Sequence, residues 1–125
     1  MKATFEIKEA TDAKFVFNLR SANDQVILTS QKYESKESAK AGIASVKQNA
    51  PIAGRYAEKS GSDGRPYFVL IAGNRQVIGR SQMYSSREAM RKGIASVKKN
   101  APVAETVDLC ARVRSAGGGS GAPLS

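Results

Sequence analysis

The sequence predicts an α+β fold in which tandem β-β-β-α repeats and a C-terminal strand share one antiparallel sheet. Both helices are expected on one face of that sheet, in a pseudo-twofold symmetric arrangement. The segment 42–53 recurs almost unchanged as 93–104, an offset of 51 residues. About half of the positions from 5 to 53 match their partner at that offset, which identifies a tandem duplication. Each copy alternates polar and apolar residues ahead of a segment with helical periodicity.

Strand patterns open each copy. Phe15, Phe17 and Leu19 fall on one face at the period of two that is typical of a strand. A turn at Asn23 and Asp24 then leads into a second apolar segment, a pattern that predicts a hairpin. The offset extends this pattern to an extra strand after the second helix. Strands are predicted at 4–8, 14–20, 25–29, 55–59, 67–72, 76–80 and 106–110.

A helix closes each copy, at about 35–49 and about 86–100. We expect Ser35 to cap the first helix, and the Ser85-x-x-Glu88 pattern predicts a capping box at the second. Gly42 and Gly93 interrupt the helices, at a cost of about 1 kcal/mol each against alanine, so we expect the backbone to approach the sheet closely there. Both helices carry an apolar stripe at helical spacing, formed by Ala39, Ile43, Val46 and Ala50 and by Met90, Ile94, Val97 and Ala101.

The repeats are expected to form one compact domain, because a copy of about 50 residues buries too little apolar surface to be stable alone. Residues 1–53 form repeat 1 and residues 54–110 form repeat 2. Residues 111–125, rich in Gly and Ser, are predicted to be a flexible tail. We therefore expect a monomer with an internal pseudo-dimer.

The composition excludes much enzyme chemistry. The chain has no His and a single Cys, Cys110, which rules out a Ser-His-Asp triad, a His-ligated metal and an internal disulfide. The segment 73–81 has glycines near a basic residue, but Arg80 stands where a P-loop needs lysine, and the glycine spacing is wrong. We interpret that segment as a turn followed by a strand. No catalytic residue, cofactor or metal is expected.

Three motifs recur in both copies: a hairpin of the form Asn-x-x-Val-Ile, a Ser-Gln-x-Tyr segment before the helix, and Gly-Ile-x-Ser-Val-Lys-x-Asn-Ala in the helix. Through these motifs the chain resembles the YegP-like family of uncharacterised bacterial proteins, over residues 5–110. The resemblance implies a tandem or dimeric fold with one sheet and exchanged C-terminal strands. It implies no activity and no catalytic residues.

The positive charge is concentrated in repeat 2. The formal net charge is +9, of which residues 1–53 hold +2 and residues 54–104 hold +7, from ten basic and three acidic side chains. The basic residues of the second helix form a candidate surface for anions or nucleic acid: Arg87, Arg91, Lys92, Lys98 and Lys99. A solvated helix face is the alternative interpretation.

Polar residues repeat at the joint between strand and helix. Gln31 and Tyr33 in repeat 1 match Gln82 and Tyr84 in repeat 2, and they form a candidate pair of related sites. A structural role for these residues is the alternative, because a tyrosine is often half buried with its hydroxyl hydrogen-bonded.

The sequence favours a small basic protein of the cytoplasm that binds or interacts rather than catalyses. It has no secretory signal pattern and no apolar run long enough for a membrane span. The expected partners are a nucleic acid or an acidic protein, and no membrane. Weak nucleic-acid binding without sequence preference is the alternative function. An exposed apolar edge strand would favour an interaction module.

Overall fold

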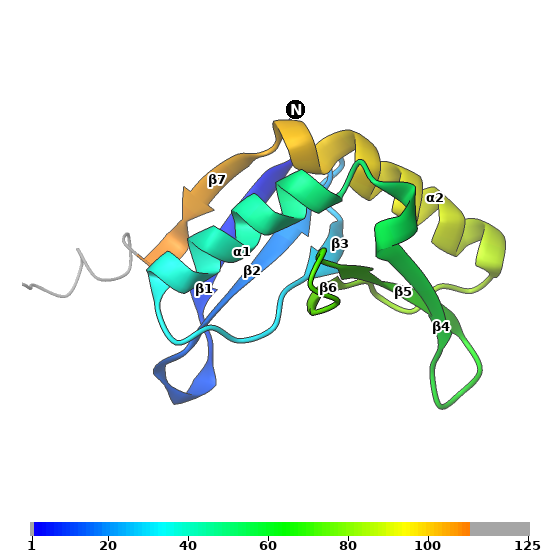
Figure 1. The fold of residues 1–125 in the computed structure, drawn as a ribbon, viewed down its shortest axis with the longest axis horizontal. Coiled ribbons are helices and arrows are strands. Elements are labelled where there is room, and N and C mark those ends of the chain that lie inside the picture. The colour runs from blue at the N-terminus through cyan, green and yellow to red at the C-terminus, as the bar shows by residue number, and fades with distance from the viewer. Residues whose placement is uncertain (1, 111–125) are drawn as a thin grey trace, which may run out of the picture.

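One seven-stranded sheet carries both helices on the same face (Figure 1). The computed structural model of the chain describes residues 2–110, so the predicted tail at 111–125 lies outside the described residues. Repeat 1 supplies β1 (Thr4–Glu9), β2 (Phe15–Arg20), β3 (Val26–Thr29) and α1 (Lys36–Asn49). Repeat 2 supplies β4 (Tyr56–Ser60), β5 (Pro66–Ile71), β6 (Val77–Arg80), α2 (Arg87–Asn100) and β7 (Glu105–Asp108). Short 3-10 turns follow the helices, η2 (Ala53–Arg55) and η3 (Ala101–Val103).

The strand order is β4-β5-β6-β3-β2-β1-β7, so the repeats meet in the middle of the sheet. There β3 and β6 pair antiparallel, with Thr29 opposite Arg80. The predicted α+β class and repeat order are confirmed, but the expectation of a wholly antiparallel sheet is wrong for the last pair. Strand β7 runs parallel to β1, because it arrives from the end of α2 by a crossover rather than a hairpin.

Each helix begins one residue after a capping serine. The Ser35 Oγ accepts a hydrogen bond from the Ser38 amide at 3.1 Å, and the Ser86 Oγ accepts one from the Ala89 amide at 3.0 Å. The prediction for Ser35 is confirmed, whereas the capping box at Ser85 is wrong. The N-cap has extended dihedral angles directly before the first helical residue, and Ser86 occupies that position.

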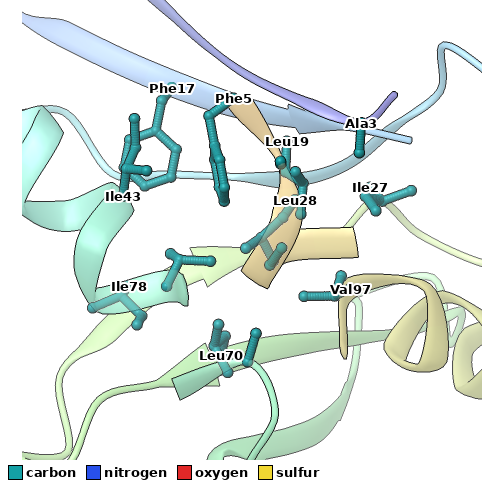
Figure 2. Close-up of a cluster of buried hydrophobic side chains, with 14 of the residues drawn as sticks. Ala3, Phe5, Phe17, Leu19, Ile27, Leu28, Ile43, Leu70, Ile78 and Val97 are labelled. Carbon is teal, nitrogen blue, oxygen red and sulfur yellow. The ribbon is translucent and has the colours of Figure 1, made fainter. Parts of the chain in front are cut away.

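The core is shared by both repeats (Figure 2). Phe5 and Phe17 from repeat 1 and Leu70 and Val97 from repeat 2 are fully buried in one cluster. The predicted apolar stripes of both helices pack against this core, and Ile94 is the one member that is only partly buried. Solvent therefore still reaches part of the α2 stripe at Ile94.

The repeated Ser-Gln segment has a structural role in the turn after β3 and after β6. The Ser30 Oγ accepts a hydrogen bond from the Phe17 amide at 2.9 Å and donates to the carbonyl of the next residue at 2.7 Å. Ser81 does the same with the Phe68 amide, at 2.9 Å, and with the carbonyl that follows it, at 2.8 Å. Both serines are buried, and their hydroxyls satisfy backbone groups at the point where the strand ends.

Candidate functional site

A groove with a volume of about 660 Å³ lies between α2 and the turn that joins β2 to β3. It crosses the boundary between the repeats, because the turn belongs to repeat 1 and the helix to repeat 2. Lys92, Lys99 and Asn100 line it from α2, Asn23 lines it from the turn, and Gln82 lines it from the segment before the helix. We call this feature the α2 groove.

The α2 groove carries uncompensated positive charge. Lys92 and Lys99 are seven residues apart, about two helical turns, so both side chains leave the same side of α2. Neither lysine forms an ion pair within residues 2–110. The described residues that line the groove include no Asp or Glu. An anion that entered the groove would therefore meet two free ammonium groups and several neutral hydrogen-bond donors.

The equivalent position in repeat 1 is occupied by Arg55 from η2. The Arg55 Nε donates a hydrogen bond to the Asn49 Oδ1 at 3.0 Å, and its guanidinium lies against Gly73 in the turn between β5 and β6. At the offset of 51 residues, Ala41 and Gln48 take the places of the two groove lysines. Repeat 1 therefore has a resident cation at this place and lacks the lysines.

Repeat 2 has no such resident group. Thr106 stands at the position equivalent to Arg55. The Asn100 amide nitrogen donates to the Ser96 carbonyl at 2.8 Å, as its counterpart in repeat 1 does to Ser45. The Asn100 Oδ1, however, accepts no hydrogen bond from any residue in the range 2–110. The α2 groove is thus open at the position that Arg55 fills in repeat 1.

Tyr84 forms part of the wall of the α2 groove, but its ring is packed. The ring stacks on Phe68, with centroids 6.3 Å apart and an interplanar angle of 14°. Its hydroxyl lies against Gly93, where a β-carbon would overlap it. Burial raises the pKa of the Tyr84 phenol, and a hydrogen bond with Gln82 offsets part of that rise. The phenol is therefore protonated at neutral pH and acts as a neutral wall.

Tyr33 in repeat 1 has the same packing. Tyr33 stacks on Phe17, with centroids 6.0 Å apart, and its hydroxyl lies against Gly42. Burial also raises the pKa of Tyr33. Gln31 instead lines a separate hollow of about 330 Å³ beside Arg80, at the junction of β3 and β6. The structure thus brings Gln82 and Tyr84 together with the groove lysines, and it does not bring Gln31 into an equivalent site. The expected close approach at the two helical glycines is to a tyrosine side chain rather than to the sheet backbone.

The five cations of the candidate nucleic-acid surface divide into two stripes on α2. At 100° per residue, Arg87, Arg91 and Lys98 lie within about 40° of one another, and Lys92 and Lys99 lie roughly 100° away from them. The first stripe faces β4, where the Arg91 Nε is 3.4 Å from a carboxylate oxygen of Glu58 and the Lys98 Nζ lies 5.7 Å from the ring centroid of Tyr56. The second stripe lines the α2 groove. The cations therefore form two adjacent surfaces and no single flat patch.

Sequence reasoning missed two groove residues as parts of a site, Asn23 from the turn between β2 and β3 and Asn100 at the end of α2. A signal was present in the repeat itself. The positions where the copies differ in charge include the exchanges from Ala41 to Lys92 and from Gln48 to Lys99, and both lysines meet in the α2 groove. The contribution of Asn23 has no such signal, because it depends on how repeat 1 packs against repeat 2.

Two further searches concern the described part of the chain. Residues 2–110 contain no group of three or more His, Cys, Asp and Glu side chains suited to holding a metal ion. None of the helices in this range combines the length and the hydropathy that crossing a bilayer requires.

Proteins of known sequence resemble the chain over most of its length. A family model described as a domain of unknown function, DUF1508, matches residues 10–56 and again residues 62–108. A UPF0339 protein of Bordetella pertussis is 51% identical over 108 residues, which cover 86% of this chain and 96% of that protein. The UPF0339 protein YegP of Escherichia coli strain K12 is 48% identical over 100 residues, which cover 80% of this chain and 91% of YegP.

Two solution NMR structures have the same fold. The structure of a UPF0339 protein from Shewanella oneidensis matches with a TM-score of 0.83 and 42% sequence identity, covering 89% of this chain and 94% of that one. The structure of yegP from Escherichia coli, described as a protein of unknown function, matches with a TM-score of 0.83 and 44% identity, covering 88% of this chain and 95% of that one. Both likenesses extend across the two repeats.

Proposed function

The chain belongs to the UPF0339/YegP family and carries the DUF1508 domain twice in tandem, and from that premise we propose that it is a non-enzymatic protein that binds an anionic group, phosphate above all, in the α2 groove. The difference between the repeats carries this proposal. Repeat 1 fills the equivalent position with the guanidinium of Arg55, whereas repeat 2 leaves it open and lines it with Lys92 and Lys99. Because repeat 1 holds its own cation at this position and repeat 2 has an open groove lined by lysines, the comparison supports a binding role for repeat 2.

The expected affinity is modest. The ammonium groups of Lys92 and Lys99 are exposed, and exposed ion pairs contribute up to about 1 kcal/mol each. Neutral donors such as the Gln82 and Asn23 amides add hydrogen bonds of similar size. Together these contacts predict a Kd on the order of 1 mM for inorganic pyrophosphate at low salt, which corresponds to about 4 kcal/mol. A larger natural ligand would add contacts outside the groove.

The proposal that the protein is not an enzyme rests on the side chains available at the groove. The sequence contains no histidine that could act as a general base near neutral pH. Burial raises the pKa of the Tyr84 phenol, so the phenol keeps its proton at neutral pH. The groove thus offers positive charge and hydrogen-bond donors, which are the requirements for holding an anion.

A titration followed by two-dimensional NMR tests the proposal. Inorganic pyrophosphate added to the full chain at low ionic strength is expected to shift the amide signals of Asn23, Gln82 and Ser96. The double variant Lys92→Gln/Lys99→Gln is expected to lose these shifts. The matched control, Lys8→Gln/Lys40→Gln, removes the same charge from exposed lysines of repeat 1 and is expected to keep them. Equal shifts in both double variants would overturn the proposal.

Weak nucleic-acid binding along both stripes of α2 is a second candidate function. The observation in its favour is that Glu58 is the single carboxylate paired with any of the five cations within residues 2–110. Binding of a labelled single-stranded oligonucleotide should weaken steeply with salt. It should also fall when Arg87, Arg91 and Lys98 are replaced by Gln, a change that leaves the α2 groove intact. Loss of oligonucleotide binding in the groove variant alone would favour the first proposal.

A further inference from the structure

The internal symmetry of the sheet leaves the outer edge of β4 without a partner strand. In the order β4-β5-β6-β3-β2-β1-β7, the first strands of the two repeats are β1 and β4, and each is related to the other by the offset of 51 residues. Strand β7 covers the outer edge of β1, and no strand within residues 2–110 covers that of β4. Figure 1 shows β7 and β4 at opposite ends of the molecule. Seven of eight symmetric strand positions are therefore filled.

The filled position shows what an eighth strand would contact. Strand β7 runs parallel to β1, with Ile7 opposite Asp108, and the Glu105 amide donates to the Ala3 carbonyl at 3.3 Å. The Lys36 Nζ at the start of α1 lies 3.1 Å from the Asp108 Oδ2. Ile43, in the apolar stripe of α1, is 3% exposed. A second ion pair joins the Lys2 Nζ to a carboxylate oxygen of Glu105 at 3.4 Å, so backbone hydrogen bonds and two ion pairs hold β7 in place.

The equivalent surface beside β4 is open. Ile94, the counterpart of Ile43, is half-buried, and Glu58, the counterpart of Ile7, is exposed. A hollow of about 290 Å³ lies there, lined by Tyr56, Glu58, Arg91 and Lys98 among others. The peptide groups of alternate residues point outward along a strand, and by analogy with β1 the Tyr56 carbonyl and the peptide groups of Glu58 point to the open edge, whereas the Tyr56 amide donates to the Ala53 carbonyl. The edge therefore presents unused hydrogen-bonding groups beside a partly covered apolar side chain.

The charges around this edge are mostly positive. Arg87 is the counterpart of Lys36, and it forms no ion pair within residues 2–110. Arg91, Lys98 and Lys59 add three positive charges, against the single carboxylate of Glu58. An occupant with an acidic side chain opposite Glu58 would place it beside Arg87, as Asp108 lies beside Lys36. The same positive charge disfavours pairing between the β4 edges of two copies of this chain.

We propose that the outer edge of β4 is a docking site for an extended, acidic segment of a different protein, added to the sheet as a parallel eighth strand. The segment carries an acidic side chain at each end of a short stretch, as Glu105 and Asp108 flank Thr106 and Val107 in β7. Its backbone bonds to Tyr56 and Glu58, an acidic side chain pairs with Arg87, and its other side chains cover Ile94. This mode of recognition adds a strand to an exposed sheet edge. It does not involve the α2 groove and is independent of the anion-binding proposal.

A peptide that copies residues 103–109 of this chain is the probe. Added to the full chain, it is expected to bind weakly and to slow hydrogen exchange at the amide of Glu58, whereas the Tyr56 amide already donates to the Ala53 carbonyl. A spin label at its N-terminus should broaden signals near Tyr56 more than those near Ser60, because a parallel strand places its start there. Two outcomes would overturn the proposal. Broadening near Ser60 instead would show that the peptide binds antiparallel to β4. Signal changes centred on β1 would show that the peptide displaces β7.

The acidic position is tested by a double-mutant cycle. Changing the aspartate of the peptide to asparagine is expected to weaken binding about three- to five-fold, as is Arg87→Gln in the protein. The two changes together should cost little more than either alone, because they remove the same contact. The control Lys40→Gln removes a charge from α1 and should leave the affinity unchanged. Full additivity in the cycle would overturn the assignment of Arg87.

Self-association is checked by sedimentation velocity on the chain alone. We expect a monomer at all accessible concentrations, because like charges meet when two β4 edges approach. One outcome would overturn the proposal: a dimer that becomes stronger in the Arg87→Gln variant and that competes with the peptide. It would show that a second copy of this chain occupies the edge of β4. The groove variant Lys92→Gln/Lys99→Gln should bind the peptide normally, which separates this test from the failure of anion binding.

Discussion

Tyr84 packs over Gly93 so closely that a β-carbon on residue 93 would overlap the phenol oxygen. Tyr33 and Gly42 form the same pair in repeat 1. Each tyrosine comes from the segment before its helix and stacks on a phenylalanine of the sheet, so the glycine makes room for a side chain between helix and sheet. This contact explains why both helices keep a residue that costs about 1 kcal/mol in helix propensity.

Replacing Gly93 by Ala is expected to destabilise the fold by about 1–3 kcal/mol, because the overpacked tyrosine ring must shift. Urea unfolding followed by circular dichroism measures the loss. Adding Tyr84→Phe to the same chain should restore part of the stability, since it removes the oxygen that the new methyl group meets. Gly54→Ala is the matched control, because a β-carbon there has nothing within 4 Å. A Gly93→Ala chain as stable as the control would contradict the packing described.

Arg55→Ala is expected to destabilise the fold by about 1–2 kcal/mol, since it leaves the Oδ1 of the buried Asn49 without its donor. Arg55→Lys keeps the charge but not the planar donor group, and it should recover only part of the loss. The change in urea midpoint at pH 7 checks both variants. Removing the exposed Lys8, which has no ion pair in the described range, serves as the control and should change the midpoint little. A loss no greater than that of the control would mean that the hydrogen bond is not formed in solution.

Exchanging three residues is expected to give repeat 1 an anion site of its own. The triple variant Ala41→Lys/Gln48→Lys/Arg55→Thr places the residues of repeat 2 at the equivalent positions, and the first two positions are exposed. If the α2 groove binds pyrophosphate through its lysines, the variant should show a second set of shifted NMR signals, near Gly73 and Asn49. The double variant Ala41→Lys/Gln48→Lys, which keeps the resident guanidinium, should bind less strongly at the new place. Unchanged stoichiometry in the folded triple variant would contradict the role given to Arg55.

Stability should fall in alkaline solution, in part through Tyr56. Burial raises the pKa of its phenol, and the hydroxyl donates to the Ala50 carbonyl at 2.7 Å. Above the ordinary tyrosine pKa of about 10, the unfolded chain releases this proton while the folded chain retains it, so the free energy of unfolding decreases as the pH rises. The urea midpoint should decline less steeply above about pH 10 in Tyr56→Phe than in the parent chain. Parallel declines would show that Tyr56 does not contribute.

The repeat offset predicts most of the fold, because each copy carries its own local signals. The alternation at Phe15 and Phe17 and the apolar stripe at Val46 and Val97 are confirmed in the structure. The parallel direction of β7 could not be predicted from the sequence pattern. Polar and apolar residues alternate in the same way in a parallel and an antiparallel strand, and the connection from α2 through η3 decides the direction of β7.

The candidate site is harder to predict from the sequence than the fold. The cations of α2 can be read from helical spacing, but their division into two stripes with different neighbours depends on β4 and on the turn near Asn23. The role of Arg55 is hidden for a related reason. It lies outside both helices, and only the packed structure places its guanidinium on Asn49.

The pairing of β1 with β7 also has a consequence for synthesis. Thr4 and Glu105, which face each other in this pair, are separated by almost the whole described chain. While the ribosome is still producing α2, the outer edge of β1 has no partner strand. Contacts between residues this distant in sequence slow folding, and they form only once the last strand has emerged. The pairing of β1 is therefore completed only after the second repeat has been synthesised, and until then the outer edge of β1 stays open in the nascent chain.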